Sequence, residues 1–257
     1  MGLLPDNHVY SYSQLSSFDE CPYGFYLERI EKVDQVQNAF AEQGTLIHDL
    51  IDLWAKGQIP IQDLPKEYEK RYADEVVSSW PRILASKGYA EKTYQQGLQY
   101  FENFDGFKGY KIINTEEKFL TTLSDRPFTG VIDMVLEDEK TGALIINDHK
   151  SKSLSSFKKE EKTIYRQQYL YSKYAKEKYG KYPDVLMFNL FKENGLKRFK
   201  DFSINEYESV LDWAIQIIEK IENYEVLDWL ESKETSDFFC QELCSVRNNC
   251  FNSMPSR

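Results

Sequence analysis

The run FTGVIDMVLEDEKTGALIINDHK, residues 128–150, determines which fold this chain can adopt. Two stretches rich in β-branched and apolar residues, Phe128–Leu136 and Ala143–Asp148, lie on either side of a polar turn over Glu137–Gly142. Such stretches with a short turn between them predict a pair of antiparallel strands. The chain therefore contains a β-hairpin, and the elements before and after it are expected to pack around a sheet.

Further strands are expected on both sides of this hairpin, because β-branched and aromatic residues recur there. They cover residues 110–123, 185–191 and 197–202. The dipeptide Asn194-Gly195 lies between the last two and is a strong hairpin signal. Apolar periodicity predicts helices over most of the first hundred residues, over Thr163–Tyr179 and over Asn205–Leu230. The order of elements predicts an α/β fold, a mixed central sheet flanked by helices.

The length of 257 residues suits one large domain. Within a single domain over 1–257 we expect a mainly helical lobe (1–108), a core (109–204), and a long helix with a cysteine-rich tail (205–257). The net charge of −10 argues against a nonspecific DNA binder, although local basic patches can coexist with it. The first residues, MGLLPD, lack the basic region of a signal peptide, and no apolar run could span a membrane. A cytoplasmic protein of a prokaryote or a phage-infected cell is expected.

Two carboxylates end apolar runs in the central hairpin. Asp133 closes Gly130–Asp133, Asp148 follows a second run, and antiparallel pairing would let the two carboxylates meet. Lys150 lies two residues after Asp148, so in a strand both side chains share one face. Carboxylate oxygens suit Mg²⁺ or Mn²⁺, and a lysine beside the cation can orient water and offset developing negative charge. His149 points the other way, so its backbone carbonyl is its expected contribution.

Four cysteines lie near the two ends of the chain: Cys21, then Cys240, Cys244 and Cys250. They can act together only if the fold brings both ends to one point. In a reducing compartment such thiols are more often metal ligands or catalysts than disulfides. Four thiolates can hold an iron–sulphur cluster or a structural Zn²⁺, and both alternatives stay open.

Five motifs follow one another along the chain. They are S-x-L-x-x-F-x-x-C-P within Tyr12–Tyr23, G-x-x-x-H at Gly44–His48, Gly130–Asp133, Asp148–Lys150, and Q-x-x-x-Y at Gln167–Tyr171. Together they resemble the PD-(D/E)XK nuclease superfamily. The resemblance is to its RecB-like branch, with AddB-type nucleases, the CRISPR-associated iron–sulphur exonuclease and related phage enzymes, and it covers nearly the whole chain.

The resemblance implies a restriction-endonuclease-like fold with an N-terminal helical lobe and a C-terminal cysteine cluster. It implies a Mg²⁺- or Mn²⁺-dependent DNA exonuclease that acts at DNA ends in recombination, repair or phage DNA processing. An acidic residue on the strand before the hairpin is expected at Glu117. The site residues that it implies are the metal ligands His48, Asp133, Asp148 and His149 and the catalytic set Asp133, Asp148, Lys150, Gln167 and Tyr171.

One early cysteine and three late ones often hold a [4Fe–4S] cluster in this branch. The resemblance therefore implies such a cluster, in a structural role, on Cys21, Cys240, Cys244 and Cys250. The spacing here is C-x3-C-x5-C, one residue longer than the usual C-x2-C-x5-C of the branch. A structural Zn²⁺ stays the alternative.

The expected partner is DNA with free ends, preferably single-stranded, and Tyr171 with the tyrosines around it could offer stacking surfaces. The pattern G-x-x-x-x-G-K-[ST] is absent from the sequence, so a helicase motor would come from a partner protein. A homo-oligomer would also fit. The alternative function is an accessory subunit of a larger complex, such as a CRISPR adaptation factor or the partner of a helicase–nuclease.

Overall fold

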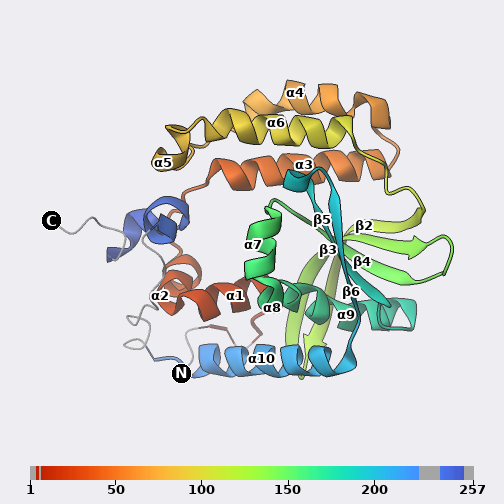
Figure 1. The fold of residues 1–257 in the computed structure, drawn as a ribbon. Helices are drawn as coiled ribbons and strands as arrows, with labels where there is room; N and C mark the ends of the chain where they lie inside the picture. The colour runs from red at the N-terminus through yellow and green to blue at the C-terminus, as the bar shows by residue number, and fades with distance from the viewer. Residues whose placement is uncertain (1–3, 6, 226–237, 252–257) are drawn as a thin grey trace. The chain divides into compact units, whose positions relative to one another are not determined.

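The structure is a computed structural model that describes residues 4–5, 7–225 and 238–251 (Figure 1). The chain forms two compact units that alternate along the sequence. The unit made of Ala39–Phe119 and Val131–Tyr207 is called the core unit here. The terminal unit comprises Met1–Asn38, Leu120–Gly130 and Glu208–Arg257. Among the described residues, no helix has the length and apolar character needed to cross a membrane. The single domain expected from the sequence stays a prediction.

A mixed sheet of six strands confirms the expected fold class. The strands pair in the order β1-β3-β4-β5-β6, and β2 also pairs with β3. The pairs β3–β4 and β5–β6 are antiparallel, whereas β4–β5 is parallel. The strands are β1 (Tyr10–Ser11), β2 (Tyr110–Leu123), β3 (Arg126–Asp138), β4 (Leu144–Lys150), β5 (Val185–Leu190) and β6 (Leu196–Asp201). The two-residue β1 was not expected, because so short a stretch carries no periodic signal.

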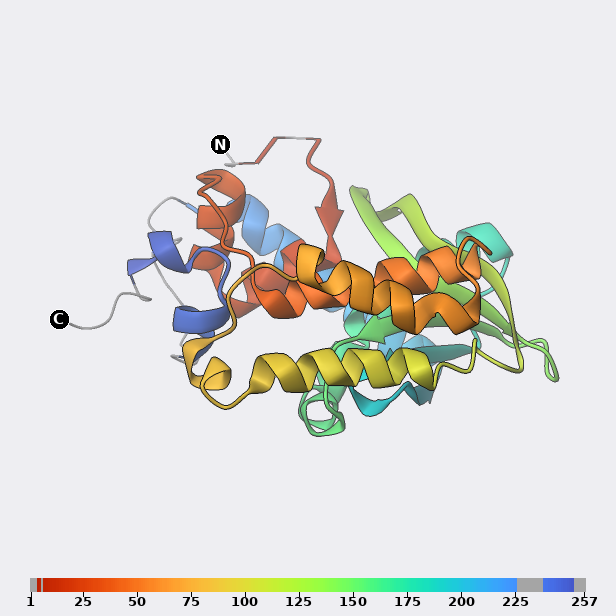
Figure 2. The same cartoon turned by 90° about the horizontal axis from the view of Figure 1, so that it is seen from above.

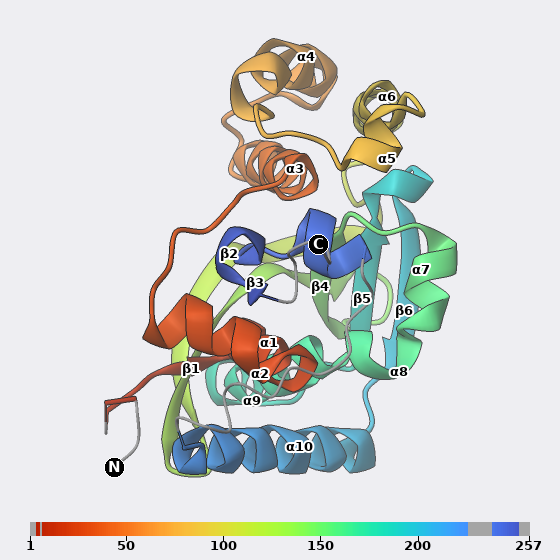
Figure 3. The ribbon, with the colours of Figure 1, turned by 90° about the vertical axis from the view of Figure 1, so that its left-hand side faces the viewer.

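Three long helices of the core unit form a layer over one face of its strands. They lie side by side in Figure 2 and are seen end-on in Figure 3. Their apolar side chains pack with Ile145 and Met187 of the sheet in one buried cluster. Gly97 lets two of the helices approach closely, since a Cβ there would lie 2.2 Å from the hydroxyl of Tyr68. The helices here are α3 (Ala39–Ala55), α4 (Leu64–Glu75), the short α5 (Arg82–Ala85) and α6 (Tyr89–Glu102), with the 3₁₀ turn η2 (Ile61–Asp63) before α4.

The other face of these strands is covered by α7 (Leu154–Lys159), α8 (Glu161–Ile164) and α9 (Arg166–Tyr179). Phe188 of β5 contacts the rings of Phe157 and Tyr165 on this side. The sequence predicted one helix from Thr163 to Tyr179, but Tyr165 separates α8 from α9. The helix α9 ends at Gly180, whose positive φ of 78° favours glycine.

The expected hairpin between β5 and β6 is confirmed. A 3₁₀ turn, η3 (Phe191–Glu193), follows β5, and Asn194 and Gly195 come next with φ values of 53° and 77°. Two successive residues with positive φ match the twist of antiparallel strands, which is why Asn-Gly is favoured there.

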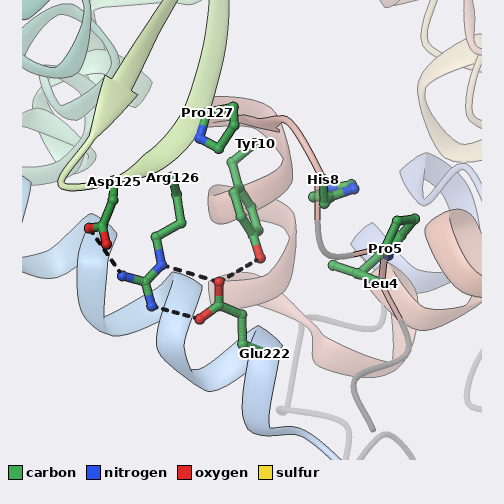
Figure 4. A pocket seen from close by; sticks show the side chains of 8 residues that line it. All are labelled: Leu4, Pro5, His8, Tyr10, Asp125, Arg126, Pro127 and Glu222. Carbon is green, nitrogen blue, oxygen red and sulfur yellow. Dashed lines mark hydrogen bonds and ion pairs between the residues drawn. The ribbon is translucent and has the colours of Figure 1, made fainter.

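In the terminal unit, β1 pairs in parallel with Phe128 and Thr129 of β3. Arg126 forms a two-bond ion pair with Glu222, which also accepts from Tyr10, at the wall of a cavity of about 390 Å³ (Figure 4). The helices of this unit are α1 (Tyr12–Glu20), α2 (Pro22–Phe25), η1 (Tyr26–Ile30), most of α10 (Ile204–Asn223), η5 (Phe239–Leu243) and η6 (Arg247–Asn249). The sequence predicted that α10 continues to Leu230, but it ends at Asn223; Tyr224 and Glu225 are not helical, and residues 226–230 lie outside the described residues.

Candidate active site

The central hairpin places two aspartates opposite each other. Met134 of β3 pairs with Asn147 of β4, Asp133 and Asp148 come next along the two strands, and Asp133 accepts from the N–H of His149 at 2.8 Å. Lys150 lies on the same face as Asp148, and its Nζ is 2.8 Å from Oδ2 and donates to Oδ1 at 3.0 Å. The expected juxtaposition of the two carboxylates and the lysine is therefore present in the structure.

His48 reaches this point from α3. Its Nε2 lies 3.0 Å from the backbone carbonyl of His149, and only an N–H can donate to that oxygen. In the neutral ring Nδ1 then carries a lone pair, and it faces Asp133 with 3.6 Å between Nδ1 and Oδ2. A histidine whose far nitrogen is held by a carbonyl is the usual arrangement of a metal-ligating imidazole.

Glu116 of β2 completes this group. Among the described residues, His48, Glu116 and Asp133 each offer a ligand atom, and these atoms all lie within 4.8 Å of one another. The inward side chains of β2 fall on even positions up to Glu116 and on odd positions from Glu117. Glu116 has a φ of +45°, a left-handed conformation uncommon outside glycine, and this local irregularity turns its side chain inward.

The neighbouring Glu117, which the sequence favoured, serves a different purpose. It is buried and accepts hydrogen bonds from Tyr174 at 2.9 Å, from Tyr179 at 2.6 Å and from Lys178. Burial raises the pKa of Glu117, but these three donors outweigh it and hold the pKa below its ordinary value. Strand periodicity could not predict which of the two glutamates faces the site. The alternation of inward and outward side chains shifts by one residue between Glu116 and Glu117.

Two carboxylates of the site, Glu116 and Asp148, lie in an environment that disfavours their charge. Burial, and next the negative charge of Asp133, raises the pKa of Glu116 to about 7. Burial raises the pKa of Asp148 to about 6, despite the opposing effect of Lys150. Carboxyl groups desolvated this close together are stabilised as anions by a nearby cation.

Lys150 is held from two sides. Besides Asp148, its Nζ donates to Oε1 of Gln167 at 3.1 Å, and Nε2 of Gln167 donates to the hydroxyl of Tyr171 at 3.3 Å. Gln168 instead donates to the backbone carbonyls of Ile146 and Met187 and belongs to the core. The structure thus resolves which of the two adjacent glutamines reaches the lysine.

Tyr171 does not offer a face for stacking. It is 8% exposed, and its ring packs edge-on against Phe119 at 5.0 Å between centroids. Burial raises its pKa, with a further contribution from the charge of Asp148. The hydroxyl of Tyr171 accepts from Gln167 and so helps to position that side chain. The expectation of a stacking role for Tyr171 is wrong.

The side chain of His149 lies away from the carboxylates, as expected. Its Nδ1 accepts a hydrogen bond of 2.9 Å from Nδ2 of Asn189, which also donates to the hydroxyl of Tyr100 at 2.8 Å. Burial lowers the pKa of His149 well below its ordinary value, so the ring is neutral. Its backbone serves the site directly, since its N–H donates to Asp133 at 2.8 Å and its carbonyl accepts from His48.

These residues fit a divalent cation. Two carboxylates and one imidazole converge, and beside them Oδ2 of Asp148 is buried, with Nζ of Lys150 at 2.8 Å as its neighbour among the described residues. Buried carboxylates this close together are unfavourable as anions unless a further cation or water satisfies them. Carboxylate oxygens with one imidazole nitrogen suit Mg²⁺ and, more readily, Mn²⁺.

The four cysteines belong to the terminal unit, and none is in a disulfide. Cys21, Cys244 and Cys250 pack in one small cluster with Tyr23, Leu27 and Val246. Burial raises the pKa of Cys21 and of Cys244, and the other thiols add to the effect. No three of the described sulfur atoms all lie within 4.8 Å of one another. Cys21 also caps α2, because its Sγ accepts from the N–H of Gly24 at 3.3 Å.

Comparison with protein families gives a match. The family model of the PD-(D/E)XK nuclease superfamily matches residues 9–251, a span that contains every residue of the site above. No curated protein matches the chain.

Proposed function

The chain belongs to the PD-(D/E)XK nuclease superfamily, and from this premise we propose that it is a metal-dependent DNA exonuclease that acts at DNA ends. The observation that carries the proposal is the convergence of His48, Glu116 and Asp133 within 4.8 Å, beside the Asp148–Lys150 pair. Recombination, repair or phage DNA processing, inside a cell and with a helicase or recombination partner, is the setting that we propose.

Each residue has a role in phosphodiester hydrolysis. A divalent cation, when bound, polarises the phosphate and makes an attacking water more acidic. His48, Glu116 and Asp133 would hold that cation, together with Asp148. Lys150 is fixed by Asp148 and Gln167, so its ammonium can orient water and offset the charge that develops on the phosphate.

The preference for DNA ends can be tested with substrates that differ only in topology. A linear single-stranded DNA should be degraded in the presence of Mg²⁺ or Mn²⁺, whereas a covalently closed single-stranded circle of the same sequence should resist. The comparison is made by following release of acid-soluble nucleotides, with EDTA as the control. Efficient nicking of the circle would show an endonuclease instead and leave the metal site as described.

We also propose a [4Fe–4S] cluster on Cys21, Cys240, Cys244 and Cys250. In a tetrahedral zinc site with Zn–S bonds of about 2.3 Å, the sulfurs lie only about 3.8 Å apart. The sulfur atoms here lack that close grouping, whereas three of the cysteines share one apolar cluster. The shared apolar cluster supports a common cofactor in the terminal unit, and the iron–sulphur assignment comes from the resemblance to the RecB-like branch.

Purification without oxygen distinguishes these cofactors. The protein should be brown, with iron and acid-labile sulphide in about equal amounts, the ratio of a [4Fe–4S] cluster. Cys250→Ala should lower both contents and the melting temperature, since the cluster ties distant parts of the chain together. A colourless preparation with one zinc per chain would overturn the iron assignment and retain the four-thiolate site.

A further inference from the structure

Two lysines, Lys152 and Lys192, follow the ends of two strands at the edge of the sheet where the candidate active site lies. The strands β4 and β5 are parallel and in register, with Lys150 opposite Leu190. Lys152 and Lys192 each follow two residues later, so both lie beyond the carboxyl ends of neighbouring parallel strands. This edge is where open α/β sheets bind their ligands. In the core unit, α6 packs against η3, the short turn that carries Lys192.

Lys192 is a partly buried cation whose charged neighbours are also cations. Its Nζ lies over the ring of Phe40, 4.6 Å from the centroid. Among the described side chains, no carboxylate lies within 4.0 Å of it. Burial, and next the charges of Lys152 and Lys92, lowers the pKa of Lys192 to about 8.

Four other lysines of the core unit differ in this respect, because each forms an ion pair. Lys197 pairs with Asp105 at 2.6 Å, Lys181 pairs with Asp184 at 2.6 Å, and Lys178 pairs with Glu117. Lys152 itself donates to both oxygens of Glu160, at 2.6 and 2.8 Å. Unlike these four, Lys192 and its neighbour Lys92 have no carboxylate within 4.0 Å among the described side chains, so both can accept an anion.

Two further features next to these lysines suit a nucleic-acid strand. The hydroxyl of Ser151, between Lys150 and Lys152, is buried and has no hydrogen-bond partner among the described residues. On the other side, Phe40 contacts Trp80 edge-on at 4.8 Å and Tyr89 at 6.0 Å, and all three rings are partly exposed. Lysines interleaved with aromatic rings are typical of surfaces that bind single-stranded nucleic acid.

We propose that Lys192, with Lys92 and next to the Lys152–Glu160 ion pair, forms a subsite for a phosphodiester group of the nucleic-acid strand whose scissile phosphate lies at Lys150. The inference rests on the proposed function and deepens it, because it says where the uncleaved part of the substrate runs. The phosphate supplies the counter-charge that Lys192 lacks, and the strand continues toward α6 and the ring of Trp80.

The test is the salt dependence of binding. A fluorescein-labelled single-stranded DNA oligonucleotide is titrated with metal-free protein over a series of salt concentrations, and binding is followed by anisotropy. Each phosphate neutralised contributes about −0.7 to the slope of log K against log salt for single strands. Lys192→Gln should reduce the steepness of the slope by about that amount and weaken binding severalfold at low salt. Lys192→Arg should restore both.

The matched control is Lys181→Gln, which makes the same change of charge at the amino end of β5, beside Asp184. It should leave the slope unchanged. Lys192→Gln should melt at or above the wild-type temperature, because it removes repulsion with Lys92 and Lys152, so weaker binding could not be attributed to unfolding. The subsite is refuted if Lys192→Gln and Lys181→Gln bind alike while the wild type binds. Failure of the wild type itself to bind would refute the proposed function, and the subsite with it.

Discussion

Asp148→Asn should reduce metal-dependent DNA cleavage on the order of a thousandfold or more. The substitution keeps the shape of the side chain but removes the buried charge that lies 2.8 Å from Nζ of Lys150. The cation then loses one anionic neighbour, and the lysine loses one of the two groups that orient it. Cleavage rates with Mg²⁺ and with Mn²⁺ measure the effect.

The control for this variant is Asp201→Asn, an exposed aspartate at the end of β6. It should cleave DNA at the wild-type rate. A thermal melt shows whether each variant is folded, and added Mn²⁺ should raise the melting temperature of the wild type and of Asp201→Asn more than that of Asp148→Asn. Wild-type cleavage by folded Asp148→Asn would show that the catalytic site lies elsewhere.

The second large effect is a contrast between two adjacent residues. Glu116→Gln should lower metal affinity by at least the roughly 10–100-fold that follows loss of an outer-shell partner, and cleavage should fall with it. Glu117→Gln should leave cleavage near the wild-type rate. Its effect is on stability, because the neutral amide cannot replace the charge that three donors stabilise.

The loss for Glu117→Gln should be about 2 kcal/mol at neutral pH, or a melting temperature lower by about 4–8 °C. The pKa of Glu117 is lower in the folded protein, so the stabilisation is complete above its ordinary pKa and is lost as the pH falls through the folded value. The difference between wild type and variant should therefore shrink in acid. Metal titrations and melts from neutral to acidic pH check both parts. If Glu117→Gln instead abolished metal binding, the ligand would be assigned to the wrong glutamate.

Much of the fold followed from local patterns. The hairpin of β3 and β4, the turn at Asn194-Gly195 and the end of α9 at Gly180 are each specified by side chains within a few residues, so the sequence predicted them. Asp148 and Lys150 could be placed on one face for the same reason, since strand geometry alone decides it. Sequence patterns predict an element correctly when residues close to it in the chain determine its conformation.

Tertiary contacts decided the rest. The assignment of Glu116 as a metal ligand depends on its backbone φ of +45°, and no nearby residue in the sequence predicts that conformation. The break at Tyr165 depends on packing of its ring against Phe188, and β1 exists because β3 offers an edge. The proposed lysine subsite could not be predicted from the sequence either. Lys92, Lys152 and Lys192 come from three separate segments, and the sequence shows neither their proximity nor which carboxylates neutralise their neighbours.

The contact between His48 and the carbonyl of His149 joins residues 101 positions apart, and β4 needs Asn189 and its neighbours as a parallel partner. At about 5–20 residues per second, a ribosome takes on the order of 5–20 s to pass from the first of these histidines to the second. Throughout that interval the nascent chain contains only some of the residues that would bind the metal. It also lacks β5, the strand that pairs with β4. We expect the metal site to stay incomplete, and the nascent chain to stay inactive, until β5 has been synthesised.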